Sequence, residues 1–206
     1  MTKSSKRQEK RLPPPANKFS YPLFLDLSGK PCVVVGGGAV AERKCLPLLK
    51  AGAAVTVVSP TLTPLLEKHK RKGLIVHKER GYKNGDIKTA FLVIAATDSE
   101  ETNGKISRDV LAFDKLLNVV DNPSLCNFIV PSVVKRGLLT IAISTGGASP
   151  AMAKAIRREI EELYGTEFSQ YLRVIKKVRA RAMKEIPNKE ERERFLKKLV
   201  ERIFRH

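Results

Sequence analysis

The sequence is poor in the residues that build disulfide frameworks and metal sites. Its 206 residues include three cysteines, three histidines and no tryptophan. The odd number of cysteines and the lack of a Cys-x-x-Cys pair fit a reducing compartment. The cysteines and histidines do not fall at a recognised zinc-ligand spacing, so we expect no metal site. These residues are Cys32, Cys45, Cys126, His69, His77 and His206.

Long apolar runs are also missing. No stretch is apolar over the roughly 20 residues that a helix needs to span a membrane. The first 20 residues hold six Lys or Arg, but the apolar segment of a secretory signal does not follow them. We therefore expect a cytoplasmic protein with no membrane association.

Acidic residues are few relative to basic ones, and the formal net charge is +18. Residues 1–20 contain six basic and one acidic residue. Residues 21–150 contain 17 basic and 11 acidic residues, and residues 151–206 contain 16 basic and nine acidic residues. Because the excess is spread along the chain, a single basic tail does not explain it. It fits a nucleic acid partner, a polyanionic small molecule or the solvated surface of a heat-adapted protein, and charge alone does not choose among them.

The most informative stretch is a run of three glycines between a strand pattern and a helix pattern. Val33–Val35 is a β-branched run, Gly36 to Gly38 follow at once, and helix-forming residues begin at Ala39. The spacing Gly36-x-Gly38-x-x-Ala41 fits the dinucleotide fingerprint, in which the phosphates face the start of the helix. We therefore predict an α/β fold of the Rossmann type that binds a dinucleotide.

The second predicted strand, 54–58, lacks the acidic residue that commonly holds the ribose hydroxyls at this place. Ser59, Pro60 and Thr61 stand there instead, and no Arg is present to meet a 2′-phosphate. We therefore predict NAD, held by hydroxyls and backbone, while NADP stays open. A helix is predicted over 61–72, and His77 ends a short strand over 74–78, where a structural role is more common than a catalytic one.

Two further strands end in polar residues that could face a ligand. The apolar run 91–96 is followed by Thr97 and Asp98, and a helix over 100–113 comes next. The strand over 116–120 ends at Asp121, before Asn122 and Pro123. Asp121 could act as an acid or base beside the cofactor, or its side chain could simply form an Asx turn before the proline, and the sequence favours neither role over the other.

A second glycine-rich turn follows the strand over 138–144. Thr145, Gly146 and Gly147 lead to Ser149, a good N-cap, and to Pro150 at the first helical position. This turn could bind an anion or serve only as a capped turn. The remaining sequence predicts helices over 152–163, 167–184 and 189–204.

Five motifs in this order resemble the precorrin-2 dehydrogenase module of the sirohaem synthase family, over residues 21–206. They are Val-Gly-Gly-Gly-Ala-Val-Ala-Glu-Arg-Lys (35–44), Ala-Ala-Thr-Asp (95–98), Asn-Val-Val-Asp (118–121), Phe-Ile-Val-Pro-Ser (128–132) and Ile-Ser-Thr-Gly-Gly-Ala-Ser-Pro (143–150). Some members carry a methyltransferase domain as well, and we expect a stand-alone dehydrogenase module here, since the sequence ends at His206.

The resemblance implies a homodimer with an N-terminal Rossmann-type parallel sheet, helices on both of its faces, and the site between domains. The expected divisions are a flexible basic extension at 1–20, an NAD-binding Rossmann domain at 21–130, a dimerisation segment at 131–150 and a small all-helical C-terminal domain at 151–206. The implied activity is the oxidation of precorrin-2, a tetrapyrrole with eight carboxylates, to sirohydrochlorin with NAD as hydride acceptor.

The resemblance also implies site residues. The catalytic residue is Asp121. The cofactor-binding residues are Gly36, Gly37, Gly38, Ala39, Val40, Pro60, Thr61, Thr97 and Asp98. The substrate-binding residues are Asn118, Thr145, Gly146 and Gly147. Basic candidates for the substrate carboxylates are Lys135, Arg136, Lys154, Arg157 and Arg158.

Three functions stay open. The first is the dehydrogenase alone, and the second adds insertion of Fe²⁺ at the same site, with Asp121 and His77 as candidates for handling metal or pyrrole protons. The third is a dinucleotide-sensing regulatory module whose basic surface meets nucleic acid. No recognition-helix or RNA-binding signature is present, so we expect a small-molecule partner and no nucleic acid.

Overall fold

A computed structural model describes residues 21–203, which form two compact units at 21–130 and 131–203. The predicted extension at 1–20 lies outside the described residues. The second unit joins the predicted dimerisation segment to the C-terminal helices, and the division of the chain into four segments stays a prediction. Within 21–203, no helix combines the length and the apolar character needed to cross a bilayer.

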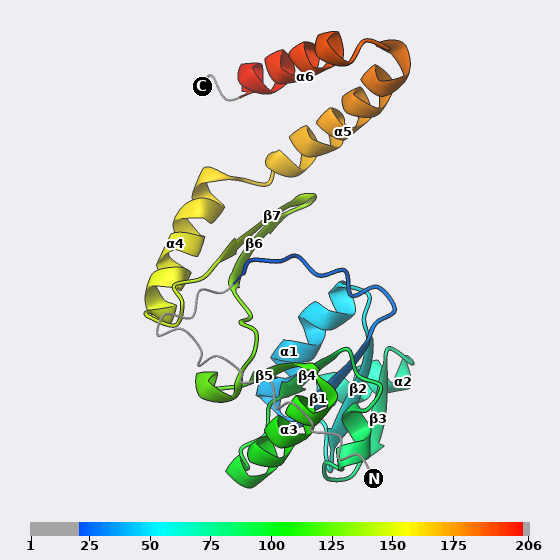
Figure 1. Cartoon of the computed structure of the whole chain (residues 1–206), viewed down its shortest axis with the longest axis vertical. Coiled ribbons are helices and arrows are strands. Elements are labelled where there is room, and N and C mark those ends of the chain that lie inside the picture. The colour runs from blue at the N-terminus through cyan, green and yellow to red at the C-terminus, as the bar shows by residue number, and fades with distance from the viewer. Residues whose placement is uncertain (1–20, 204–206) are drawn as a thin grey trace, which may run out of the picture. The chain divides into compact units, whose positions relative to one another are not determined.

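The first unit is built on a parallel sheet of five strands with the order β3-β2-β1-β4-β5 (Figure 1). The strands are β1 (Pro31–Val35), β2 (Ala54–Ser59), β3 (Ile75–Glu79), β4 (Leu92–Ala95) and β5 (Leu116–Val119). The helices are α1 (Ala39–Lys50), α2 (Pro64–Arg71) and α3 (Glu100–Phe113), with short 3₁₀ turns η1 (Asn84–Ile87) and η2 (Pro123–Leu125). The predicted Rossmann-type parallel sheet is confirmed.

Both faces of the sheet are buried because side chains alternate along its central strands. In β1, Cys32 and Val34 belong to a core cluster that α1 and α2 share, whereas Val33 and Val35 belong to a second cluster with α3 and η1. The third fingerprint position, Ala41, is fully buried. This close packing of α1 on the sheet fixes the start of the helix at the carboxyl end of β1.

The predicted start of the second helix is wrong. The helix was expected from Thr61, but α2 begins at Pro64, and Thr63 caps it by accepting a hydrogen bond from the Leu66 N–H. Proline suits the first helical position because that N–H has no intrahelical partner. Pro60 and Thr61 therefore lie in an extended loop after β2.

The open edge of β5 is covered by the segment that follows η2. Asn127 acts like a short sixth strand: its N–H donates to the Leu117 carbonyl, its Oδ1 accepts from the Leu117 N–H at 2.7 Å, and its Nδ2 donates to the Lys115 carbonyl. The Cys126 thiol accepts from the Val119 N–H at 3.1 Å. These bonds hold the turn after β5, which carries Asp121.

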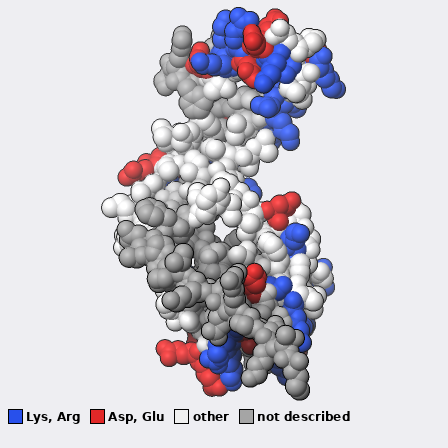
Figure 2. Space-filling view, viewed as in Figure 1, with Lys and Arg blue, Asp and Glu red and all other residues white. Residues whose placement is uncertain are grey.

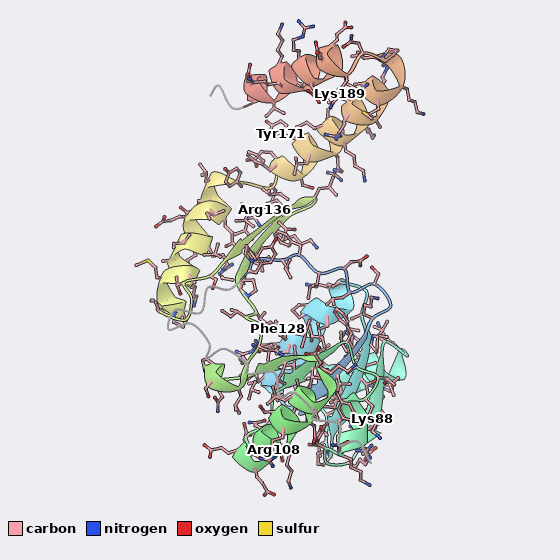
Figure 3. All side chains as sticks on the ribbon, viewed as in Figure 1. Lys88, Arg108, Phe128, Arg136, Tyr171 and Lys189 are labelled. Atoms are coloured by element: carbon pink, nitrogen blue, oxygen red, sulfur yellow. The ribbon has the colours of Figure 1, made fainter. Side chains whose placement is uncertain are left out.

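The second unit contains an antiparallel pair, β6 (Ser132–Arg136) and β7 (Leu139–Ile143), and the helices α4 (Pro150–Leu163), α5 (Phe168–Glu185) and α6 (Lys189–Ile203). The sequence analysis did not predict β6. Arg136, labelled in Figure 3, donates from Nε to the Tyr164 carbonyl at 2.9 Å and from Nη2 to the Glu161 carbonyl at 3.1 Å. It thereby joins β6 to the end of α4.

Candidate dinucleotide site

A pocket of about 450 Å³ lies at the carboxyl edge of the parallel sheet. This is where open α/β sheets bind ligands. All nine residues predicted to bind the cofactor line it, together with seven others. The lining residues are Val35, Gly36, Gly37, Gly38, Ala39, Val40, Val58, Ser59, Pro60, Thr61, Gly81, Tyr82, Ala96, Thr97, Asp98 and Thr102.

The three glycines of the first turn differ in what a side chain would meet at each of them. Gly36 has φ +119°, and a Cβ there would meet the Ala96 carbonyl. A Cβ at Gly37 would collide with the Thr61 carbonyl and approach the Ser59 hydroxyl. A Cβ at Gly38 would have no atom of the described residues within 4 Å. Gly36 and Gly37 therefore serve packing, and Gly38 keeps room for a ligand.

The start of α1 is open to a ligand. Its N-cap, Gly38, provides no side-chain hydrogen bond, whereas Thr63, Ser99 and Ser149 each cap the helix that follows them. The first N–H groups of α1 therefore have no side-chain acceptor, and the positive end of the helix dipole adds to them. None of the lining residues that the structure describes is a Lys or Arg. These features fit the pyrophosphate of a dinucleotide, which this helix start would hold.

The loop after β2 is held by its own hydrogen bonds. The Ser59 hydroxyl donates to the Thr61 carbonyl at 2.7 Å, and His77 Nε2 donates to the Ser59 carbonyl at 2.9 Å. The Thr63 N–H donates to the Gly37 carbonyl at 3.0 Å, which ties this loop to the glycine turn. His77 lies outside the pocket lining and supports this loop from β3. Ser59 and His77 therefore shape the pocket wall.

The loop after β3 contributes a wall that the sequence analysis missed. The Tyr82 hydroxyl donates to Asp109 Oδ2 in α3 at 2.8 Å, and Asn84 Nδ2 donates to the other oxygen of Asp109. Burial, together with the hydrogen bond to Asp109, raises the pKa of the Tyr82 phenol above its ordinary value. Tyr82 is the one aromatic residue in the largely polar stretch 80–88, and this isolated position is the sequence feature that could have indicated a role in the pocket.

The same loop is anchored by a buried carboxylate, whose side chain is only 2% exposed. Asp86 accepts hydrogen bonds from Arg80 and Lys78 side chains at 2.7 and 2.8 Å and from the Lys83 N–H at 2.9 Å. The bonds from Arg80, then those from Lys78 and Lys83, hold the pKa of the Asp86 carboxyl well below its ordinary value, against the opposing effect of burial. Tyr82 is thus fixed between two anchored positions.

Asp121 lies in the exposed turn directly after β5, with φ +59°. Aspartate is among the few residues that accept this left-handed conformation. The turn belongs to the same sheet edge as the pocket, because parallel strands end on one side. Asn118 lies within β5, and its Nδ2 donates to the Phe128 carbonyl at 3.2 Å. Its amide therefore already supports the segment that covers β5.

The predicted turn at Thr145–Gly147 lies in the second unit, and its polar groups are paired internally. Thr145 Oγ1 accepts from the Ser149 N–H and donates to the Ser149 carbonyl, both at 3.1 Å. The Ser149 hydroxyl accepts from the Met152 N–H and caps α4. Gly146 and Gly147 have φ +62° and +88° and face open space. This arrangement is the capped turn that the sequence allowed.

The basic candidates of the second unit differ in their surroundings. Arg136 is engaged with the end of α4, and Arg157 pairs with Glu161. Lys135, Lys154 and Arg158 are exposed and make no side-chain ion pair within residues 21–203. Figure 2 shows further Lys and Arg side chains gathered over α5 and α6, and α5 alone carries six of them with one acidic residue.

The structure describes no group of three His, Cys, Asp or Glu side chains within 21–203 that could hold a metal.

Comparisons with known proteins match both units. Residues 23–132 match the family model described as "Putative NAD(P)-binding", and residues 136–163 match "Sirohaem biosynthesis protein central". The siroheme synthase of Thioalkalivibrio sulfidiphilus is 41% identical over 88% of this chain and 37% of its own length. That of Methylobacillus flagellatus is 48% identical over 70% of this chain and 31% of its own. The chain thus spans about a third of the length of these relatives.

A solved structure matches over nearly its whole length. The structure named SirC, precorrin-2 dehydrogenase, is 30% identical, superposes with a TM-score of 0.79, and is matched over 88% of this chain and 89% of that one. With an NAD(P)-binding sheet, a sirohaem-biosynthesis segment and this likeness, the chain belongs to the precorrin-2 dehydrogenase family.

Proposed function

We propose that this protein oxidises precorrin-2 to sirohydrochlorin with NAD as the acceptor, as part of sirohaem biosynthesis. Precorrin-2 loses two electrons and two protons in this reaction, as one hydride and one proton. Bound NAD would accept the hydride. The observation that carries the proposal is a single sheet edge with two features: an uncapped helix start in a pocket after β1, and an exposed aspartate after β5, two strands away.

Each residue of this edge has a role in the proposal. The N–H groups at the start of α1 would bind the pyrophosphate, and the loop at Pro60 and Thr61 would border the ribose. Thr97 and Asp98, after β4, would border the part of the dinucleotide nearest to Asp121. Asp121 would accept the proton that the macrocycle releases, because its carboxylate is exposed beyond β5.

The decisive experiment compares two aspartates in the same backbone conformation. Asp121 and Asp114 are both exposed and both have positive φ, at +59° and +51°. Asparagine also tolerates this conformation, so Asp121→Asn and Asp114→Asn each remove a charge without straining the turn. We expect Asp121→Asn to lower kcat about 10²- to 10⁴-fold, with unchanged NAD affinity, and Asp114→Asn to leave kcat unchanged.

The assay follows the absorbance of precorrin-2 with NAD⁺ in the absence of oxygen, and then adds Co²⁺ or Fe²⁺. An Asp121→Asn variant at the full rate would exclude the proton-accepting role. If the unaltered protein binds NAD⁺ but oxidises nothing, the regulatory-module alternative is favoured. Insertion of metal into the product would establish the bifunctional alternative, with the metal as a substrate.

Further parts of the proposal concern partners and location. A homodimer is supported by exposed apolar side chains on the hairpin formed by β6 and β7. Val133 in β6 is 43% exposed, and Leu138 in the turn between the two strands is 55% exposed. The carboxylates of the substrate would meet Lys135, Lys154 and Arg158. A cytoplasmic location is supported by free Cys32, Cys45 and Cys126.

A further inference from the structure

One wall of the dinucleotide pocket has a chemistry different from the rest. Glycines, small apolar residues and hydroxyl side chains make up most of the lining, and Tyr82 is the one aromatic side chain among the sixteen described lining residues. Tyr82 is half-buried, and it packs against the core cluster between the sheet and α3. A planar ring at the border of a pocket suits a planar ligand group.

The polar end of Tyr82 is turned away from any ligand. Its hydroxyl donates to Asp109 at 2.8 Å, and Asp109 is held in turn by Asn84. The loop on either side of the ring is fixed by Arg80 and Lys83, which both bind Asp86. These bonds hold the ring in place before any ligand binds. Stacking of a ligand on it therefore costs the protein little conformational entropy.

The order of the strands says which half of a dinucleotide would reach this wall. The pyrophosphate would sit over the turn after β1, at the centre of the order β3-β2-β1-β4-β5. Asp121 follows β5 on one side, and Tyr82 follows β3 on the other. If the reacting nicotinamide lies toward Asp121, the adenosine half extends toward the loops after β2 and β3.

We propose that Tyr82 is the surface on which the adenine base of the cofactor stacks. The proposal rests on the dinucleotide binding and orientation given under the proposed function. Stacking of a base on an aromatic ring contributes roughly 1–3 kcal/mol when measured by truncation, which corresponds to about 5- to 150-fold in affinity. The role of Tyr82 is in binding, and it takes no part in the transfer of hydride or proton.

The test measures binding by calorimetry with three probes: NAD⁺, ADP-ribose and nicotinamide mononucleotide. Tyr82→Leu removes the ring and keeps an apolar side chain of similar bulk, so it should weaken NAD⁺ and ADP-ribose alike, about 5- to 150-fold, and leave the mononucleotide unchanged. The matched control, Tyr82→Phe, keeps the ring and loses only the bond to Asp109. It should stay within about threefold of the unaltered protein for every probe.

Unchanged binding of ADP-ribose to folded Tyr82→Leu would overturn the proposal, and so would an equal loss for the mononucleotide. Failure of the unaltered protein to bind NAD⁺ or ADP-ribose at all would overturn the cofactor assignment itself, a different result from either of these. A second measurement does not need Tyr82→Leu to fold. In the unaltered protein, NMR should show contacts between the adenine H2 or H8 protons of bound ADP-ribose and tyrosine ring protons. Tyr82→Phe removes the tyrosine signals of residue 82, so the loss of these contacts in that variant assigns them to Tyr82. Their absence in the unaltered protein would overturn the proposal.

Discussion

Two turns of this chain share one pattern, a strand followed by a glycine-rich turn and a helix, and they differ in what completes them. In the turn from β1 to α1, the helix start has no side-chain cap, and two of the three glycines are pressed against neighbouring backbone. In the turn from β7 to α4, Ser149 caps the helix, Thr145 closes the turn, and both glycines face open space.

The difference shows that glycines in similar sequence patterns can be required for different physical reasons. In the second turn, Gly146 and Gly147 are explained by their own positive φ, so the turn is complete without a ligand. In the first turn, Gly37 is explained by the approach of the loop after β2, whereas no contact within residues 21–203 explains Gly38. A residue that local packing does not explain points to a ligand.

The largest expected effect in this comparison is that of Gly37→Ala. Its methyl group would collide with the Thr61 carbonyl, which belongs to the backbone and cannot rotate away, and it would also press on the Ser59 side chain. The backbone of two loops must shift, so we expect a loss of about 3 kcal/mol in the free energy of unfolding. Thermal or urea unfolding measures it.

The matched control is Gly38→Ala, one residue further along. A methyl group there meets no atom within 4 Å, and the backbone of Gly38 is extended, with φ −81°. Its unfolding free energy should stay within about 0.5 kcal/mol of the unaltered protein. Equal losses for the two variants would show that the turn responds to any side chain and would remove the distinction drawn between Gly37 and Gly38.

The next largest effect is expected for Gly38→Asp, which should maintain or raise the stability of the protein but lower its affinity for NAD. Aspartate is a good N-cap and favours the positive end of a helix, so stability should hold or rise by a few tenths of a kcal/mol. Its charge would face the pyrophosphate, and NAD affinity should fall about 100-fold. Calorimetry with NAD⁺ gives the affinity, and thermal unfolding gives the stability.

Gly38→Asn separates charge from bulk, since it caps equally well and is neutral. It should lose clearly less affinity than Gly38→Asp, and the difference should shrink at high salt. If Gly38→Asp binds NAD⁺ as the unaltered protein does, the start of α1 does not hold the pyrophosphate.

The parts of the fold and site that the sequence predicted are those with local causes. Continuous apolar runs predicted the buried strands, and the glycine spacing predicted the first turn, since each depends on neighbours in the chain. The cap at Thr63 was also local, in the Thr63-Pro64 pair, but the helix pattern was extended over it. This error placed Thr61 in a helix, although the structure has it in a loop that lines the pocket.

What the sequence did not predict depends on contacts between distant residues. Gly37 is constrained by Thr61 across two elements, and Tyr82 is oriented by Asp109, 27 residues away. The cover of β5 by Asn127 replaces backbone pairing with side-chain bonds, so it has no strand pattern to detect. Likewise β6 is a short, half-exposed strand whose alternation is weak. Pattern alone therefore found the pocket's centre and missed its outer wall.

The smallest expected effect concerns the second turn and tests whether it is complete in itself. Ser149→Ala removes the acceptor for the Met152 N–H, at 3.1 Å, and should cost about 1 kcal/mol of stability. Hydrogen exchange should locate the loss in the second unit, at the start of α4, and NAD affinity should not change, since Ser149 lies outside the pocket lining. Ser149→Thr keeps a hydroxyl at the same position and should restore most of the stability. If Ser149→Ala costs nothing, the Ser149 hydroxyl does not hold the capped turn, and the contrast drawn with the uncapped start of α1 would lose its energetic basis.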